Sequence, residues 1–302
     1  MAFISTKLRA FAFSMALVPV LGVAAEESAQ AIMEKVDHAT RKSFDTQLAF
    51  VKITTCKYTV VKGSVQCTER PREVVAENTK KVRIENGLFY DNSLSIQRDP
   101  ISDRGTSLLV YEYGERGRAN DNWIYLPALG KINRVIANDD EAGSVFGSEF
   151  SVESTENPEA RKVYEYTYKI LDEVKQDGRD AWVIELLPTP EKARTTSYTK
   201  VVAWIDKKTY LTLKEDLYRG AKVHKQRTQS GIKEVDGVYV TTIAIMNNLT
   251  TSRISQMAKL SMRHNIPVND EFLTQRALTD FSFRERNLAQ FRAALNVEPA
   301  SQ

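Results

Sequence analysis

The chain has 302 residues, of which 42% are hydrophobic and 27% are charged, and its formal net charge is +3. This composition is ordinary for a soluble globular protein, and the length allows one large or two small domains. The charge is too small, and basic and acidic residues alternate too closely, to indicate a nucleic-acid-binding surface. We therefore predict no nucleic-acid partner.

The first 25 residues have the three parts of a secretory signal peptide. Lys7 and Arg9 form a basic region, residues 10–21 are apolar, and residues 23–25 (Val-Ala-Ala) are the small residues of a cleavage site. The apolar run is short for a membrane span of about 20 residues, so an uncleaved anchor is the weaker alternative. We expect residues 1–25 to be removed from an exported protein that carries no lipid anchor.

Helical periodicity follows over residues 27–48. Ala29, Ile32, Met33, Val36 and Ala39 fall on one face, and most charged residues lie elsewhere. The pattern predicts an amphipathic helix that buries its apolar face.

The two cysteines, Cys56 and Cys67, both lie in the exported part of the chain. An even number of cysteines in an oxidising compartment favours a disulfide. Between them, a turn at residues 62–64 separates two strand-like runs, so the bridge would close a hairpin if the two ends lie in register. Redox-active thiols are a weaker alternative because the spacing is not Cys-x-x-Cys, and a metal site is weaker still because no histidine is near.

From residue 49 onward the chain shows strand patterns joined by tight turns. Asn86-Gly87, Asp177-Gly178 and Asp236-Gly237 are strong hairpin signals. The predicted strands are 47–54, 73–84, 106–113, 123–126, 164–173, 181–188, 198–206, 211–218, 222–232, 238–247 and 252–264. A resumed alternation also marks residues 131–136. Short turns between so many consecutive strands predict a large, mostly antiparallel meander that curves around a helix.

Other stretches do not read as strands. Residues 91–103 and 138–147 are loop-like and could hold short helices, and residues 287–294 look like a terminal helix or a weakly packed tail. No fixed-period repeat or interdomain linker is present, so one domain is the economical interpretation.

Several predicted strands carry apolar residues on both faces. In residues 198–206, for example, Val201 and Ala203 share one face while Val202 and Trp204 share the other. A sheet with one solvated face does not need this pattern. Either both faces are covered, or one face lines a cavity; the residues alone leave both open.

Aromatic residues near the middle of the chain are candidates for such a lining. Trp123 and Tyr125 share one side of a strand, and Phe146 and Phe150 stand among small residues after an acidic, glycine-containing loop. Bulky rings beside a loop are consistent with either a pocket or a core.

No catalytic signature accompanies these residues. The chain lacks the His-Glu-x-x-His, Gly-x-Ser-x-Gly and phosphate-loop patterns, and its three histidines are scattered. Residues 139–141 (Asp-Asp-Glu) lack the spacing of a calcium loop, so a solvated turn is the better interpretation. We predict no enzyme activity, no metal site and no cofactor; an envelope hydrolase is the weakest alternative.

A series of blocks resembles a known family. The blocks Arg104-Gly105-Thr106, residues 123–129 (Trp-Ile-Tyr-Leu-Pro-Ala-Leu), 146–151 (Phe-Gly-Ser-Glu-Phe-Ser), 198–206 and 272–278 occur in that order. Together they are similar to the LolA-like superfamily of outer-membrane lipoprotein-sorting proteins. The resemblance covers roughly residues 27–278, whereas the cysteine hairpin and the segment beyond 278 lie outside its pattern.

The resemblance implies a mainly β fold in which a half-closed antiparallel barrel wraps around helices. It divides the chain into the signal peptide (1–25), a lipid-binding domain (26–280) and a C-terminal helix or tail (281–302). It also implies a periplasmic location and an apolar cavity that receives the acyl chains of a lipid or lipoprotein. The cavity candidates are Trp123, Tyr125, Phe146, Phe150, Trp182, Trp204 and Met246.

The function implied is that of a non-covalent lipid carrier, with a transporter of the resistance-nodulation-division (RND) type or another envelope protein as partner. The alternative is a periplasmic sensor on the same fold that reports lipid state to a membrane partner. In either case the 138–147 loop is the predicted lid, because it places small and charged residues beside Phe146 and Phe150.

Overall fold

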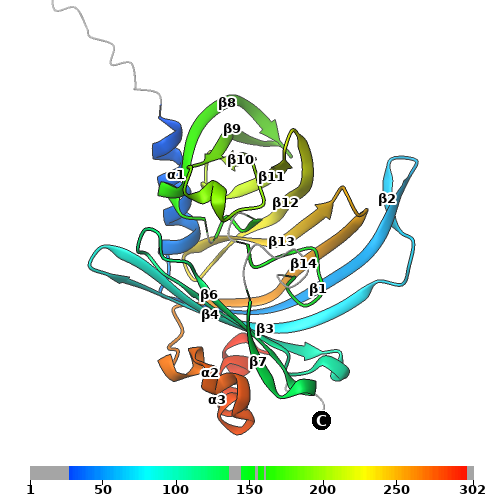
Figure 1. Cartoon of the computed structure of the whole chain (residues 1–302), viewed down its shortest axis with the longest axis vertical. Coiled ribbons are helices and arrows are strands. Elements are labelled where there is room, and N and C mark those ends of the chain that lie inside the picture. Colours follow the sequence, from blue (N-terminus) through cyan, green and yellow to red (C-terminus); the bar gives the residue numbers. More distant parts are fainter. Residues whose placement is uncertain (1–26, 136–143, 154–155, 160, 298–302) are drawn as a thin grey trace, which may run out of the picture.

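A computed structural model of the chain describes residues 27–135, 144–153, 156–159 and 161–297 (Figure 1). The predicted signal peptide and residues 138–143 of the predicted lid lie outside these ranges, as does the acidic triplet 139–141. In the part that the structure describes, no helix combines the length and the apolar character needed to cross a membrane.

The described strands form one antiparallel sheet. Their order across it is β7-β6-β5-β4-β3-β1-β14-β13-β12-β11-β10-β9-β8, and the short strand β2 pairs only with β1. The strands are β1 (Thr46–Val61), β2 (Ser64–Cys67), β3 (Arg72–Glu85), β4 (Leu88–Asp99), β5 (Ser107–Glu112), β6 (Asp121–Leu126), β7 (Lys131–Val135), β8 (Tyr166–Gln176), β9 (Arg179–Pro188), β10 (Lys200–Asp206), β11 (Thr212–Arg219), β12 (Lys222–Val235), β13 (Val238–Asn248) and β14 (Arg253–His264). The predicted curved antiparallel sheet is confirmed, and it is not a closed barrel, because β7 and β8 are its two edges.

The sheet consists of two meanders that meet where β1 pairs with β14. Each meander follows chain order, and the junction joins the first long strand to the last one. Gln47 lies opposite His264 there, and Lys57 lies opposite Arg253. The predicted hairpin turns are present within the meanders; Asp236 and Gly237, for example, both have positive φ, as a two-residue hairpin turn requires.

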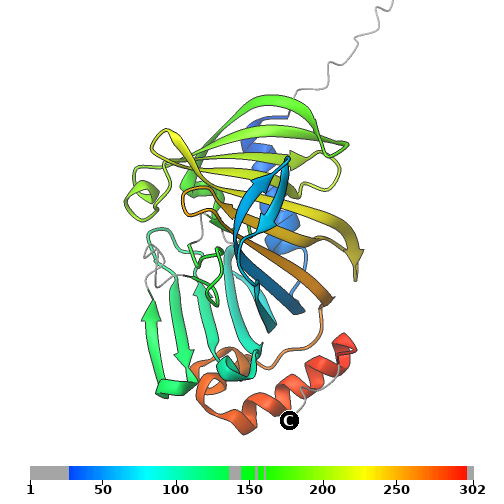
Figure 2. The ribbon, with the colours of Figure 1, turned by 90° about the vertical axis from the view of Figure 1, so that its right-hand side faces the viewer.

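The N-terminal helix is shorter than predicted. α1 (Ala29–Asp37) buries Ile32, Met33 and Val36, and a turn of π-helix (His38–Lys42) ends it before β1 begins. Thr40 Oγ1 donates to Val36 O at 2.8 Å, and Ser43 Oγ donates to Ala39 O at 2.9 Å. Such bonds from hydroxyls to the backbone compete with regular helix, so the helix stops well before residue 48. α1 lies among strands β8–β12 in Figures 1 and 2; the side of the sheet facing it is called the inner face.

Two further helices cover the opposite side, the outer face. α2 (Gln275–Thr279) and α3 (Phe281–Leu295) lie together along it (Figure 2). Phe283, Leu288 and Phe291 of α3 are buried in a core cluster with Leu48 and Leu94 of the sheet. Arg292 donates to both carboxylate oxygens of Glu77, at 2.5 and 2.7 Å. Of the two alternatives predicted for residues 287–294, a terminal helix or a weakly packed tail, the structure has the helix.

Strand β4 was missed by the sequence pattern. Residues 91–99, expected to be loop-like, continue as a strand that pairs with both β3 and β5. The residues that hid it, Asp91, Ser93 and Ser95, line a cavity on the inner face, while Leu94 and Ile96 pack on the outer face. Because the inner residues of β4 are polar and few of its outer residues are apolar, the sequence lacks the clear alternation by which a strand is recognised.

The predicted disulfide is confirmed. Cys56 and Cys67 are bonded, with their Cα atoms 5.8 Å apart, and β2 pairs with the end of β1 beyond the bridge. This hairpin projects from the sheet at the right of Figure 1. Val60 and Val65 lie opposite each other on it and are exposed.

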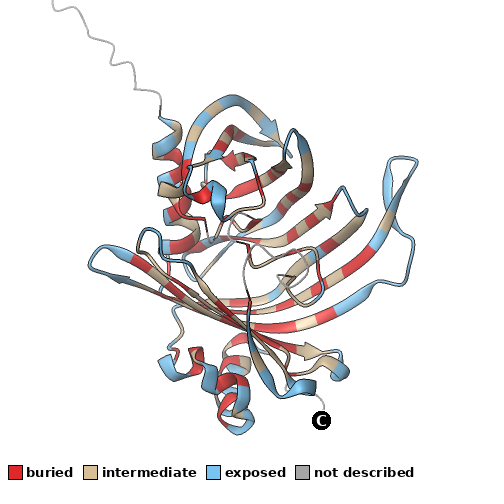
Figure 3. Cartoon of the chain, in the orientation of Figure 1, coloured by how far each residue is buried: buried red, intermediate tan, exposed pale blue. Residues whose placement is uncertain are grey.

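Burial explains the apolar residues on both faces of the strands. Buried and partly exposed positions alternate along much of the sheet (Figure 3), and clusters of buried apolar residues occupy both faces. The outer cluster packs under α2 and α3, and the inner clusters pack against α1 and residues 44–51. Both interpretations of the pattern hold in part, because the inner face also lines cavities.

Candidate functional site

Two adjoining cavities lie on the inner face. The first, of about 230 Å³, is lined mainly by β1, β3–β5 and β12–β14, and by residues within 145–152 and 156–159. The second, of about 270 Å³, lies beside β5 and β6 and residues 144–147. Leu108, Val145 and Phe146 line both cavities, so Phe146 stands at the boundary between them.

The first cavity has an apolar part. Val51 and Ile53 of β1 face it, as do Met246 of β13, Met257 of β14 and Phe150. Methionine side chains are flexible and polarizable, and they adapt to apolar partners of irregular shape. This part can accept a hydrocarbon chain without any specific polar contact.

Residues 144–151, here called the inner segment, run past both cavities. Ser144 and Ser151 form a β-bridge that closes the segment into a loop, and Phe146 sits at its tip with φ of 52°. Glu149 anchors the segment: it accepts from Arg253 Nε at 2.9 Å and from Asn248 Nδ2 at 2.8 Å. Arg72 also donates to the carbonyl oxygen of Phe146.

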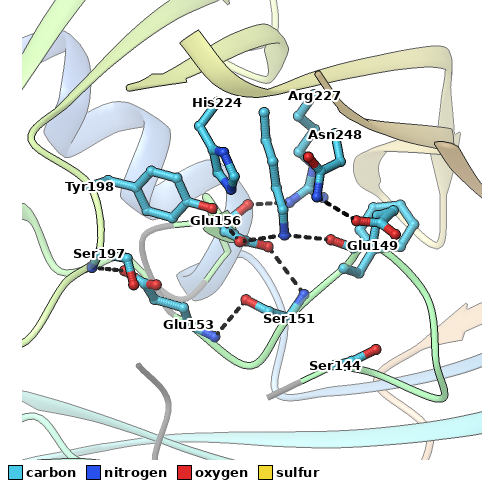
Figure 4. A network of polar contacts seen from close by, with 12 residues as sticks. Ser144, Glu149, Ser151, Glu153, Glu156, Ser197, Tyr198, His224, Arg227 and Asn248 are labelled. Carbon is cyan, nitrogen blue, oxygen red and sulfur yellow. Dashed lines mark hydrogen bonds and ion pairs between the residues drawn. The ribbon is translucent and has the colours of Figure 1, made fainter. Parts of the chain in front are cut away.

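A buried polar network holds the chain that follows (Figure 4). Glu156 accepts from Tyr198 Oη at 2.5 Å, from Lys225 Nζ at 2.8 Å and from the Ser151 backbone at 3.1 Å. Arg227 Nη1 donates to the Glu156 carbonyl oxygen at 2.9 Å. Burial, together with the Glu156 carboxylate, raises the pKa of Tyr198, so its hydroxyl stays a donor. The network ties Ser151 and Glu156 to Tyr198, which precedes β10, and to β12.

The other end of the first cavity is charged. Lys80 pairs with Asp91 at 2.5 Å, and Arg41 pairs with Glu112 at 2.9 Å. Burial raises the pKa of Glu112, and neighbouring Asp91 adds to that rise against the effect of Arg41. Burial also acts to raise the pKa of Glu159, but the charges of Lys259, Lys80 and Arg227 outweigh it and hold this pKa at about 2.

Three of the predicted cavity residues lie together. Phe146, Phe150 and Met246 all line the first cavity, and Met246 is fully buried. They come from segments about 100 residues apart, which the sheet and the inner segment bring to one place.

Trp123 and Tyr125 lie elsewhere. Both pack into the outer cluster beside α2 and α3, where the Trp123 ring meets Tyr111 edge-on at 5.0 Å. Their strand neighbours Ile124 and Leu126 line the second cavity instead. The predicted alternation of residues 123–126 is present, but the second cavity lies on the face of β6 that carries Ile124 and Leu126, not on the aromatic face.

The remaining two tryptophans line neither cavity. Trp182 stacks on Tyr210 at 5.7 Å beside the cluster around α1, and Lys207 lies over its ring. Trp204 is half-buried under Lys214, whose Nζ is 4.0 Å from the ring centroid.

The polar lining was not anticipated as part of the site. In the sequence, Asp91 and Ser93 look the same whether they belong to a loop or to the polar wall of a cavity. Asp91 comes to lie opposite Glu112 only because β4 pairs with β5. No group of three or more His, Cys, Asp or Glu side chains in the described ranges is arranged to hold a metal ion.

Comparison with known proteins places the fold. A family model described as "Uncharacterized protein" matches residues 90–280. A DUF1329 family protein from Desulfovibrio piger superposes with a TM-score of 0.71 at 22% identity, over 83% of this chain and 97% of the other. A putative outer membrane lipoprotein-sorting protein domain from Vibrio parahaemolyticus gives a TM-score of 0.69 at 22% identity, over 83% and 98%.

A LolA superfamily protein from Nitrosomonas europaea is also similar, with a TM-score of 0.57 at 19% identity over 82% of this chain and 97% of the other. At these identities the likeness shows the fold, which is LolA-like as predicted. No curated protein matches the sequence.

Proposed function

Because the chain belongs to the family whose model matches residues 90–280 and has a LolA-like fold, we propose that it is a periplasmic carrier that holds lipid acyl chains without covalent chemistry. The location rests on the signal peptide predicted for residues 1–25. The Vibrio and Nitrosomonas proteins share the fold, and the proposal extends to this chain the lipoprotein sorting named for the former.

The observation that carries the proposal is the pair of cavities that meet at Phe146. Ligand sites in proteins typically measure about 300–1,000 Å³, and the two cavities reach that range only when joined. Phe146 contributes to both linings, so rotation of its side chain would join them into one elongated space. The apolar part of the joined space, lined by residues such as Val51, Met246 and Phe150, suits a hydrocarbon chain.

Burial of hydrocarbon supplies enough binding free energy. Each methylene moved from water into an apolar site contributes about 0.8 kcal/mol, so a long acyl chain gains roughly 10 kcal/mol before ordering costs. No bond is made or broken, and release needs only an acceptor of comparable affinity.

The test is native mass spectrometry with lipid extraction, on full-length protein expressed with its N-terminal segment and purified from the periplasm. We expect co-purified lipid on the wild type and a loss of at least tenfold in occupancy for Phe146→Asp, because a carboxylate would stand between the two cavities. Phe281→Asp is the matched control, since Phe281 is 62% exposed on α3 and should leave occupancy unchanged.

Phe146→Asp could lose lipid simply because it misfolds, so a second variant with an uncharged, larger side chain is tested beside it. Phe146→Trp keeps an aromatic ring and should reduce lipid occupancy while leaving the melting temperature close to that of the wild type. Wild-type protein without lipid in every preparation, or full occupancy in both Phe146 variants, would refute the proposal.

Transfer between vesicles separates the carrier from the sensor alternative. A carrier moves labelled lipid from donor to acceptor vesicles in proportion to its concentration, whereas a sensor binds lipid without net transfer. An RND-type exporter as the acceptor partner remains part of the proposal, and its test is co-purification of such a transporter with the lipid-loaded protein.

A further inference from the structure

The polar end of the first cavity is built by three neighbouring strands. Asp91 of β4 lies opposite Glu112 of β5, and Asn120 directly precedes β6, whose Asp121 lies opposite Tyr111. Asp91, Glu112 and Asn120 therefore form a row across the sheet, and all three line the cavity. Gln229 of β12 lines the same cavity from the other meander.

Three side-chain oxygen atoms at this end are shielded from solvent and accept no hydrogen bond from the described residues. Asp91 Oδ1, Asn120 Oδ1 and Gln229 Oε1 have no hydrogen-bond partner among the described residues. Asp91 is 5% exposed and Gln229 is 7% exposed. The other polar atoms of these two side chains are engaged: Asp91 Oδ2 pairs with Lys80, and Gln229 Nε2 donates to Thr212 O at 2.7 Å. A buried oxygen left without a donor is costly, so each one favours a donor supplied from the cavity.

Among the described residues that line this cavity, unpaired hydrogen-bond donors are fewer than unpaired acceptors. Arg227 Nε is the corresponding unpaired donor in the described part of the lining. The ammonium groups of Lys80 and Lys259 already face Asp91 and Glu159. In total, the described lining holds four carboxylates (Asp91, Glu112, Glu156, Glu159) and three cations (Lys80, Arg227, Lys259).

We propose that the ligand of this cavity carries a hydrogen-bond-donating polar group, a hydroxyl or an ammonium, that enters the row of Asp91, Glu112 and Asn120 while its hydrocarbon chain lies against Met246, Met257 and Phe150. This inference rests on the proposed carrier function and adds the class of lipid. A terminal carboxylate or sulfate supplies acceptors only and would meet four carboxylates in a shielded site. A hydroxylated or amine-bearing lipid supplies donors to the oxygens that lack them.

The experiment compares probes with one common hydrocarbon chain. Binding of 1-monooleoylglycerol, oleylamine, oleate and oleyl sulfate to the delipidated full-length protein is measured by competition with the apolar dye N-phenyl-1-naphthylamine, below the micelle concentration of each probe. We expect monooleoylglycerol or oleylamine to bind about tenfold more tightly than either anion, since one unsatisfied buried group costs about that factor. The two donor probes distinguish a hydroxyl from an ammonium ligand.

Variants localise the preference. Asn120→Leu and Gln229→Met remove acceptor oxygens without removing a charge, and each should reduce the preference for the donor probes at least threefold while dye affinity stays within twofold. Gln256→Met, at an exposed position of β14, is the matched control and should keep the wild-type preference. Asp91→Asn is the stronger variant but breaks the Lys80 pair, so its folding is checked first by circular dichroism.

The outcomes separate the two proposals. Equal or tighter binding of oleate or oleyl sulfate, with intact dye binding, overturns the donor-lipid inference and leaves the carrier function in place. An unchanged preference in both Asn120→Leu and Gln229→Met also overturns it. Absence of binding for the dye and every probe overturns both proposals.

Discussion

At the scale of single residues, loss of the buried Glu156 carboxylate should destabilise the folded protein. Lys225, its partner, is 8% exposed and makes one further bond, to the Glu149 carbonyl oxygen at 2.9 Å. Glu156→Gln keeps the shape but leaves this ammonium without a counter-charge. We expect the free energy of unfolding to fall by about 3 kcal/mol, as is usual when one partner of a buried ion pair is neutralised. Urea denaturation of both proteins measures the change.

Glu173→Gln is the control for that experiment. Glu173 pairs with Lys207 at an exposed site, where an ion pair contributes about 0–1 kcal/mol. Similar losses in the two variants would mean that the buried network around Glu156 is no more important than a surface pair.

The sequence pattern put Phe150 and Trp123 in one predicted group, but in the structure Phe150 lines the first cavity and Trp123 packs into the outer cluster. Period-two alternation identifies which residues share a face of a strand, but it does not say which face is the inner one. That choice is made by α2 and α3, which cover the aromatic side of β6. The sequence pattern of these helices is also weak, since buried Arg284 interrupts the apolar stripe of α3.

At the scale of elements, α3 is a structural part of the molecule. Phe291 is 6% exposed and meets Phe272 edge-on at 5.1 Å within the outer cluster. Phe291→Ala should lower the free energy of unfolding by about 3–5 kcal/mol, the cost of deleting a buried aromatic ring. Thermal denaturation tests this, with Phe281→Ala on the exposed side of α3 as the matched control. Equal melting temperatures for the two variants would contradict the packing described for α3.

Strand β4 shows why elements are missed. Its inner residues are polar because they line a cavity, and its outer apolar residues are too few to reveal the period. The hairpin turns, in contrast, are encoded locally by Asn-Gly and Asp-Gly pairs, so the meander could be predicted strand by strand. Pairing of β1 with β14 has no local signal and appears only in three dimensions.

At the scale of the whole molecule, the junction of the two meanders should be sensitive to pH. His264 on β14 shares a hydrogen bond of 3.1 Å with Gln47 Nε2 on β1, and its Nδ1 lies 3.0 Å from Val235 O. With Nδ1–H donating to the carbonyl, Nε2 must be unprotonated to accept from the amide. Burial and nearby Lys259 lower the pKa of His264, although Val235 O and Asp236 oppose this.

The sign of the effect follows from that lowered pKa. The unfolded chain takes up the proton at the ordinary histidine pKa of 6.5 and the folded chain only at lower pH. Stability contributed by neutral His264 is therefore complete above about pH 6.5 and is lost as the pH falls through 6 and below. Chemical denaturation at a series of pH values should show this loss.

His264→Gln identifies the source of the pH dependence. The variant retains hydrogen-bonding groups but does not titrate, so its stability should vary less between about pH 7 and 5 than that of the wild type. Carboxylates with lowered pKa, such as Asp236, act only near and below their ordinary value of 3.8 and leave this window unaffected. Parallel curves for the two proteins would exclude His264 as the titrating group.

The pairing of the first long strand with the last also determines when the chain can fold. Gln47 and His264 are 217 positions apart, so the central ladder cannot form until nearly the entire polypeptide is available. Contacts of such long range make folding slow. During synthesis, the β1 strand therefore stays without its β14 neighbour until the C-terminal part of the chain has been made. The first cavity is lined by β1 and by strands of both meanders, so it too can form only after this last pairing is made.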